Sequence, residues 1–195
     1  MTITNKSQDE IGVLSRVFQQ MVDSMRVYLE HTSERAYIDS LTGVKNRNAY
    51  DERMDALMSQ LKKEQNHDGF GIVVCDINNL KYINDHFGHD FGNSLIINSC
   101  KLICQVFMHS PVYRIGGDEF VVLLLKDDLK NVDSLMEDIY RRMKESMENK
   151  SPDEQLSIAV GVAIYDPEAG DDYRSVFKRA DEDMYQRKIA MKKNM

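Results

Sequence analysis

Acidic residues occur in two places where the surrounding sequence could hold a metal ion. Asp76 closes the apolar stretch 73–75, and Asp118 and Glu119 follow the glycine pair 116–117. An acid at the end of a strand lies close to solvent, although it is as commonly a cap for the next helix. Two glycines before two acids often form no more than a turn, because glycine allows the positive φ angles of a tight turn. Each position alone therefore leaves a structural role open.

The two positions are more informative together. If the strand that ends at Asp76 lies beside a hairpin that carries Asp118, the two carboxylates face each other across neighbouring strands. Carboxylates with a nearby backbone carbonyl are hard ligands that suit Mg²⁺ or Mn²⁺, and these ions commonly arrive with phosphates. A two-metal site of this kind supports in-line phosphoryl transfer. The acids therefore predict metal-assisted chemistry on a phosphorylated substrate.

Four strands and four helices are predicted around these acids. The strand segments are short, apolar and rich in β-branched residues, whereas the helical segments are longer and amphipathic. The strands are expected at 70–77, 112–115, 119–126 and 156–164, and the helices at about 46–64, 94–108, 132–147 and 173–192. The order β-α-β-β-α-β with added helices predicts an α+β, ferredoxin-like fold, an antiparallel sheet with helices on one face.

A further helix is predicted from about residue 8 to residue 36. Its apolar residues recur in steps of three and four, the a/d spacing of a coiled-coil seam. They are Ile11, Leu14, Phe18, Met21, Met25 and Tyr28. An amphipathic helix folded onto its own domain is the alternative, but the narrow apolar stripe favours a partner helix. We expect residues 1–36 to form a dimerisation helix and residues 37–195 to form the functional domain.

The composition narrows the class of protein. There are 25 basic and 32 acidic residues, and the formal charge of −7 argues against a nucleic-acid binder, which uses Lys and Arg to neutralise phosphates. The longest wholly apolar run, 120–125, is too short to span a bilayer. The three cysteines have no paired spacing and are expected to be reduced and buried, as in a cytoplasmic domain.

Four motifs in order give a more specific indication. They are 39–47 (Asp-Ser-Leu-Thr-Gly-Val-Lys-Asn-Arg), 76–90, 114–120 (Arg-Ile-Gly-Gly-Asp-Glu-Phe) and 180–188. With them, the segment from Asp39 to Lys192 resembles the GGDEF family of diguanylate cyclases, whose fold is the nucleotidyl-cyclase or palm-like form of the ferredoxin-like arrangement. The resemblance implies an enzyme that joins two GTP molecules into cyclic di-GMP and releases two pyrophosphates.

The resemblance also implies a metal site and catalytic groups. Asp76, Asp118, Glu119 and the backbone carbonyl of Ile77 would bind Mg²⁺ or Mn²⁺, with two ions per GTP site. Asp118 would in addition orient or deprotonate the ribose 3′-hydroxyl that attacks the α-phosphate of the other GTP. Lys81 would stabilise the charge that builds on the phosphates. For Glu119, a solvated position at the start of a strand is the alternative.

Phosphate contacts are implied at two places in the sequence. Backbone N–H groups of Asn79, Leu80 and Lys81 would bind the phosphates at a helix N-terminus. Lys188 and Lys192 lie one helical turn apart and share a face, which in the family reaches the β- and γ-phosphates. The alternative for the two lysines is a solvated basic tail.

Asn84, His89 and Asn93 would contact the guanine or the ribose, although His89 could be a structural loop residue. Position 93 is usually Asp, which accepts both donors on the guanine edge, whereas Asn offers one acceptor and one donor group. We expect a loss of about 1–3 kcal/mol of guanine selectivity, with some use of ATP. Asn78 also replaces a common Asp, which is tolerable because the residue is not an essential ligand, and Met191 replaces a common Gly. A catalytically weak or inactive GGDEF domain, acting as a GTP-binding and dimerising module, is therefore the alternative function.

The reaction joins two GTP molecules and each domain holds one, so the resemblance implies a homodimer. The stretch 9–21 is similar to the end of a HAMP signalling domain, which connects membrane receptors to cytosolic output domains. That similarity implies an upstream membrane sensor. This domain would lie in the cytoplasm, and the full-length protein would be anchored in the bacterial inner membrane.

Overall fold

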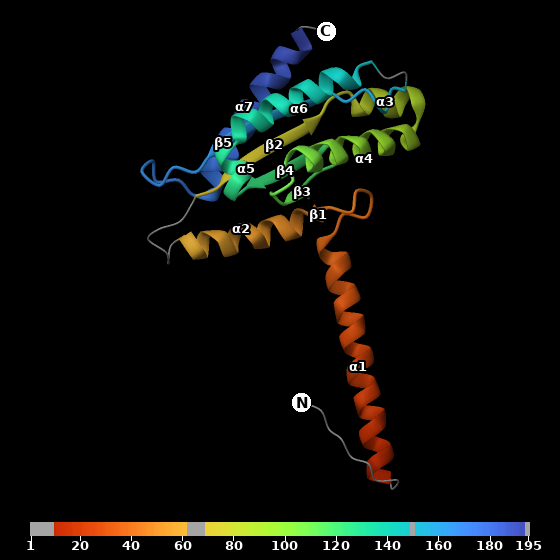
Figure 1. The fold of residues 1–195 in the computed structure, drawn as a ribbon. Coiled ribbons are helices and arrows are strands. Elements are labelled where there is room, and N and C mark those ends of the chain that lie inside the picture. The colour runs from red at the N-terminus through yellow and green to blue at the C-terminus, as the bar shows by residue number, and fades with distance from the viewer. Residues whose placement is uncertain (1–9, 62–68, 149–150, 194–195) are drawn as a thin grey trace. The chain divides into compact units, whose positions relative to one another are not determined.

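The computed structural model describes residues 10–61, 69–148 and 151–193, and the chain divides into two compact units. One unit ends at Ile38, and the other begins at Asp39. The first unit contains helix α1 (Glu10–Tyr37), which confirms the predicted leading helix (Figure 1). No helix in the described residues has both the length and the apolar character needed to cross a membrane.

The predicted seam of α1 is partly described. Leu14, Phe18, Met21 and Met25 are exposed. The side chains of the other two predicted seam residues, at positions 11 and 28, lie outside the described part of the structure.

The second unit is built on a five-stranded sheet with the order β1-β3-β4-β2-β5. The strands are β1 (Lys45–Asn46), β2 (Gly71–Ile77), β3 (Val112–Arg114), β4 (Glu119–Leu124) and β5 (Ile158–Ile164). Strand β2 lies between β4 and β5 and is antiparallel to both, β3 is antiparallel to β4, and the short β1 runs parallel to β3. The predicted α+β, ferredoxin-like core is confirmed.

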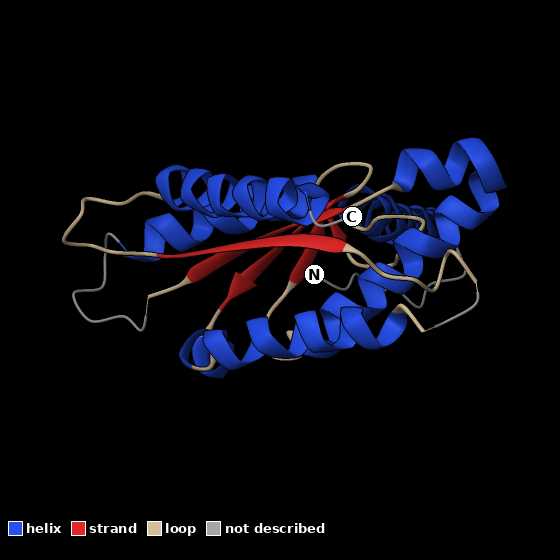
Figure 2. Ribbon diagram, turned by 90° about the horizontal axis from the view of Figure 1, so that it is seen from above, coloured by secondary structure: helices blue, strands red, loops and turns tan. Residues whose placement is uncertain are grey.

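Helices cover both faces of the sheet, as Figure 2 shows, so the expectation of helices on one face was wrong. Helices α4 (His89–Val106) and α6 (Val132–Ser146) pack on one face, and α2 (Arg47–Leu61) and α7 (Tyr173–Lys193) pack on the other. The reason is visible in β2, in which every residue is buried and apolar side chains alternate between two separate cores. A strand buried on both faces reads as a continuous apolar run.

Helix α7 lies unusually close to the sheet because of Gly161 in β5. A β-carbon at this position would overlap the backbone nitrogen of Met184 and the carbonyl oxygen of Ala180, both in α7. The side-chain carboxylate of Asp183 also accepts a hydrogen bond from the backbone N–H of Val162 (3.0 Å). These contacts fix the height and the register of α7 over the sheet.

Two elements were not predicted, β1 and α5 (Lys126–Lys130), and α3 (Leu80–Phe87) was expected only as a helix N-terminus at 79–81. Helix α3 follows directly after β2, and α4 then begins at His89, five residues before the predicted start at Ser94. Gly88 separates the two helices with a φ of 90°. The end of the helix predicted over 46–64 lies outside the described residues, since α2 is described to Leu61.

Candidate active site

The three predicted acidic residues lie at the same end of strands β2 and β4. Asp76 pairs with Glu119 in the antiparallel register, and the backbone N–H of Ile77 donates to the carbonyl oxygen of Asp118 (3.0 Å). Directly opposed residues of an antiparallel pair project from the same face. The prediction that Asp118 lies opposite Asp76 was therefore wrong by one residue, because Glu119 takes that position and Asp118 lies in the turn just before β4.

The turn between β3 and β4 has a different basis from the one expected. Neither Gly116 nor Gly117 uses the positive φ that a glycine allows. Gly116 leaves space for a side chain: a β-carbon there would lie 2.5 Å from the Oε2 atom of Glu119. The glycine lets the Glu119 side chain fold back over the turn.

Arg114 ties this turn to the residue that opens the domain. Its Nη1 atom lies 3.0 and 3.2 Å from the two carboxylate oxygens of Asp39, and its Nη2 atom donates to the carbonyl oxygen of Gly117 (2.7 Å). Asp39 also accepts hydrogen bonds from the backbone N–H and the hydroxyl of Thr42. Burial raises the pKa of the Asp39 carboxyl, but the hydrogen bonds from Thr42 and Arg114 outweigh it and hold this pKa below its ordinary value.

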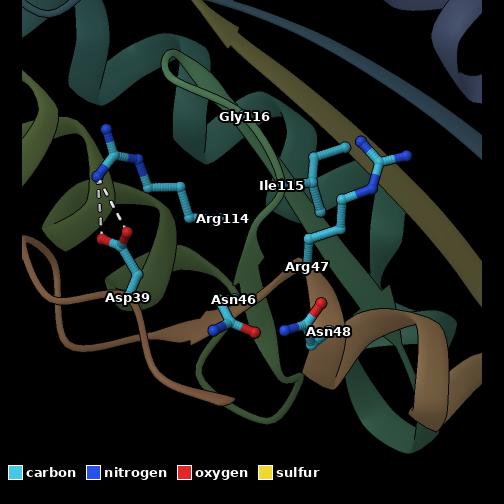
Figure 3. A pocket seen from close by; sticks show the side chains of 7 residues that line it. All are labelled: Asp39, Asn46, Arg47, Asn48, Arg114, Ile115 and Gly116. Carbon is cyan, nitrogen blue, oxygen red and sulfur yellow. Dashed lines mark hydrogen bonds and ion pairs between the residues drawn. The ribbon is translucent and has the colours of Figure 1, made fainter. Parts of the chain in front are cut away.

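The Asp39–Arg114 pair forms one side of an open pocket of about 400 Å³. Figure 3 shows Arg47 and Ile115 on the opposite side of it. The residues that line it are Asp39, Asn46, Arg47, Asn48, Arg114, Ile115 and Gly116. The role of Arg114 was not predicted, although both partners lie inside the quoted motifs 39–47 and 114–120.

Lys188 of α7 reaches across the sheet to Asp76. Its Nζ atom lies 2.6 Å from the Oδ1 atom of Asp76, and the two side chains are 25% and 10% exposed. Lys192, one helical turn further along α7, is exposed. The two lysines, which the sequence analysis grouped together, therefore have different environments: Lys188 is paired with an acid and Lys192 is exposed.

The N-terminus of α3 lies directly beyond β2. Asn79 precedes the helix in the left-handed conformation (φ 62°), which turns the chain so that the helix begins at Leu80. Lys81 is exposed in the first turn, where backbone N–H groups have no partner within the helix. The expected helix N-terminus at 79–81 is confirmed.

The three residues predicted to contact guanine and ribose lie on the α3–α4 pair. His89 and Asn93 are exposed on α4, and Asn84 is half-buried on α3. A β-carbon on Gly92 would overlap the Oδ1 atom of Asn84, so the Asn84 amide lies against α4 at Gly92, the residue before Asn93. The structure thus brings Asn84 close to position 93, and the loop on which a structural role for His89 was considered is a helix start.

Two departures from the family pattern meet beside the acidic residues. The Nδ2 group of Asn78 donates to the hydroxyl of Ser157 (3.1 Å) and lies 3.8 Å from the sulfur of Met191. The Oδ1 atom of Asn78 is buried and has no hydrogen-bond partner among the residues that the structure describes. The two replacements therefore contact each other, which sequence spacing could not show.

The side chains alone do not form a closed metal cage. Over 10–61, 69–148 and 151–193, no group of three His, Cys, Asp or Glu side chains is arranged to hold an ion. The cation that Asp76 does hold is the Lys188 ammonium. The predicted cysteine state agrees with the structure, in which all three thiols are free and Cys75 and Cys100 are buried, whereas Cys104 is half-buried.

Comparison with known proteins identifies one family over most of the chain. The family model described as "Diguanylate cyclase, GGDEF domain" matches residues 36–194. Diguanylate cyclase DgcP of Escherichia coli is 32% identical over 91% of this chain and 52% of its own length. Biofilm architecture maintenance protein MbaA of Vibrio cholerae is 30% identical over 95% of this chain and 24% of its own length. This chain thus spans between about a quarter and a half of these relatives.

A solved structure shows that the fold is shared. The coiled coil and GGDEF domain of DgcB from Caulobacter crescentus, in complex with c-di-GMP, superposes with a TM-score of 0.80. It is 24% identical and covers 93% of this chain and 96% of that one. The family match begins at residue 36, so the HAMP-like character of the leading helix stays a prediction.

Proposed function

The chain belongs to the GGDEF domain family, and from this premise we propose that it is a diguanylate cyclase. The observation that carries the proposal is the placement of Asp76, Asp118 and Glu119 at one end of the sheet, between the N-terminus of α3 and Lys188. In the proposed reaction the 3′-hydroxyl oxygen of each GTP attacks the α-phosphorus of the other. Two P–O bonds to pyrophosphate break, two protons are released, and one cyclic di-GMP forms.

The acidic residues fit a divalent cation. Asp76 already holds a cationic ammonium at 2.6 Å, and Glu119 lies opposite it in register. Asp76, Asp118, Glu119 and the Ile77 carbonyl would hold Mg²⁺ or Mn²⁺, two ions per GTP, with phosphate oxygens completing the ligand set. When bound, such ions activate the attacking hydroxyl and neutralise phosphate charge. Asp118 would orient the 3′-hydroxyl or take its proton.

Phosphate binding is assigned to groups on both sides of the acidic residues. The free N–H groups at the start of α3 attract anions, and Lys81 stands in that first turn. Lys188 and Lys192 would approach the β- and γ-phosphates from α7. On α4, Asn93 beside Asn84 would contact guanine, and we keep the proposal that Asn93 relaxes the choice of base.

A second copy of the chain is required to complete the reaction. Leu14 and Met21 on α1 are 69% and 68% exposed, which leaves an apolar stripe of the kind that a coiled-coil partner buries. Replacing both by Glu should convert the dimer into a monomer in light-scattering experiments. It should also remove cyclase activity, because one domain holds one GTP.

A catalytically weak, GTP-binding signalling module is the second candidate. The contact between Asn78 and Met191, both departures from the family pattern, favours it. Incubation with GTP and Mg²⁺, followed by chromatography of the products, separates the two candidates. The cyclase releases cyclic di-GMP and pyrophosphate, and Asp118→Ala abolishes both. GTP binding without either product would establish the second candidate instead.

A further inference from the structure

The ion pair between Asp76 and Lys188 has a consequence beyond phosphate binding. We propose that Lys188 competes with the divalent cation for Asp76, so that metal binds tightly once a triphosphate has drawn the lysine away. This inference rests on the proposed function and adds a coupling between the metal and the nucleotide. Lys188 would be a positioning residue that links the two.

Burial explains why the pair forms. The Asp76 side chain is 10% exposed, and a carboxylate so poorly hydrated needs an opposite charge close by. Among the described residues, Lys188 makes the one ion pair of Asp76, and it does so from a position 112 residues away in the sequence. Without nucleotide, Lys188 therefore takes the place that a metal ion would need.

The backbone of α7 is packed closely against the sheet beside this place. Gly161 holds the helix backbone against β5, and the Asp183 carboxylate accepts a hydrogen bond from the N–H of Val162 (3.0 Å). Val176 and Ala180 of the same helix are fully buried. The lysine stem, in contrast, is flexible and ends in a compact ammonium. The Lys188 ammonium can thus leave Asp76 by a change of side-chain conformation, without movement of the helix backbone.

Charge decides the order of events. An ammonium and a divalent cation on the same carboxylate repel each other, and they do so more strongly away from bulk water. A triphosphate offers the ammonium a new anionic partner within reach of α7. Metal and triphosphate then support each other's binding, and by thermodynamic reciprocity each raises the affinity of the other by the same factor.

The proposal and a role in phosphate binding alone predict different effects of removing Lys188 on the affinity for metal. If Lys188 only contacts phosphate, its removal leaves nucleotide-free metal binding unchanged. If Lys188 competes at Asp76, its removal tightens that binding. Couplings of this type are typically about 5–150-fold, and we expect about tenfold.

The test is Mn²⁺ binding to the nucleotide-free chain, followed by the electron paramagnetic resonance signal of free Mn²⁺. Lys188→Met should lower the Kd for Mn²⁺ about tenfold relative to the unaltered chain. Lys192→Met is the matched control: it lies on the same helix, is exposed, and removes the same charge. It should leave the Kd unchanged. Equal affinities for the two variants, or weaker binding by Lys188→Met, would overturn the proposal.

Lys188→Met leaves the buried Asp76 carboxylate unpaired, so its stability is a second readout. Thermal unfolding should show a larger rise in Tm on adding Mn²⁺ for this variant than for the unaltered chain, because the ion replaces the lost counter-charge. Lys188→Arg keeps the charge and should behave like the unaltered chain. If Lys188→Met folds only with Mn²⁺, the proposal stands. If it stays unfolded at saturating Mn²⁺ while Lys188→Arg folds, the proposal fails.

The result also separates this inference from the proposed function. A chain that binds no Mn²⁺ with or without a non-hydrolysable GTP analogue has no metal site, and the proposed function fails with it. A chain that makes cyclic di-GMP, but whose Lys188→Met variant binds Mn²⁺ as the control does, loses only the coupling role of Lys188.

Discussion

Strand β2 offers different chemistry to the two layers of helices that cover it. At its C-terminal end, Cys75 and Ile77 are 0% and 1% exposed and point into the apolar core under α4 and α6. Asp76 and Asn78 are almost as buried, at 7% and 5%, but they meet polar and basic groups of the α7 side, among them Lys188. Burial is thus equal on the two faces, and only the partners differ. The face of the sheet that carries the candidate site is therefore recognised by the partner of its buried charge, Lys188 beside Asp76, and not by the degree of burial.

The comparison predicts the largest effect for Asp76→Asn, which keeps the side-chain size and removes the charge. Cyclic di-GMP formation should fall at least about 10³-fold, because the carboxylate proposed to bind the metal is lost. Product chromatography measures the loss, and circular dichroism controls for the fold. A variant that keeps more than a tenth of the activity would show that Asp76 does not hold the reacting centre.

On the apolar face, Ile139→Ala should act on stability and leave the chemistry intact. Ile139 is fully buried in α6, and its truncation leaves a cavity that costs about 2–5 kcal/mol of unfolding free energy. Urea denaturation measures this cost. GTP turnover per folded molecule should stay unchanged. A loss of turnover at full stability would show that the apolar face also contributes to the chemistry.

Asn93→Asp tests base selection on α4, away from both cores. The restored carboxylate accepts two hydrogen bonds from the guanine edge, and the preference for GTP over ATP should rise by about 1–3 kcal/mol. The ratio of kcat/KM for the two nucleotides measures it. If the unaltered chain already excludes ATP completely, Asn93 does not relax the choice of base.

The smallest effect is expected at Asp39, outside both cores. Its pKa lies below the ordinary 3.8 in the folded state because of Thr42 and Arg114, whose hydrogen bonds outweigh the opposing effect of burial. Because the pKa of Asp39 is lower in the folded chain than in the unfolded chain, its ionised carboxylate stabilises the fold at pH values above 3.8. This stabilisation is lost as the pH falls from 3.8 towards the pKa of the folded state.

Asp39→Asn should therefore cost about 1 kcal/mol at pH 6, and the difference from the unaltered chain should shrink below pH 4. Urea unfolding at several pH values measures this. A difference that stays constant down to pH 3 would mean that the Asp39 charge does not stabilise the turn.

Much of the fold could be predicted because its strands are short, apolar and β-branched. Strands β2, β4 and β5 fall within or close to their predicted ranges, as do α2, α6 and α7. The hydrophobic pattern did not show helix α3, because the start of the helix depends on Asn79 in a left-handed conformation and its end on Gly88 at φ 90°. These are backbone choices that the hydrophobic pattern does not report.

The candidate site was predictable as a set of residues and not as a set of contacts. Family motifs supplied Asp76, Asp118 and Glu119, but the register that pairs Asp76 with Glu119 depends on the geometry of the β3–β4 turn. The Lys188 contact depends on how closely α7 approaches β5 at Gly161, far away in the sequence. The spacing of residues along the sequence predicts neither the pairing of Asp76 with Glu119 nor the contact of Lys188 with Asp76.

The most direct test of the account is the stoichiometry of products released from GTP and Mg²⁺ by the intact chain. If two domains face each other and each holds metal and GTP at its acidic strand ends, the chain should release two pyrophosphates for each cyclic di-GMP. The rate per chain should fall when the protein is diluted into monomers. Pyrophosphate release without cyclic di-GMP, or release that persists undiminished in Asp76→Asn, would contradict it.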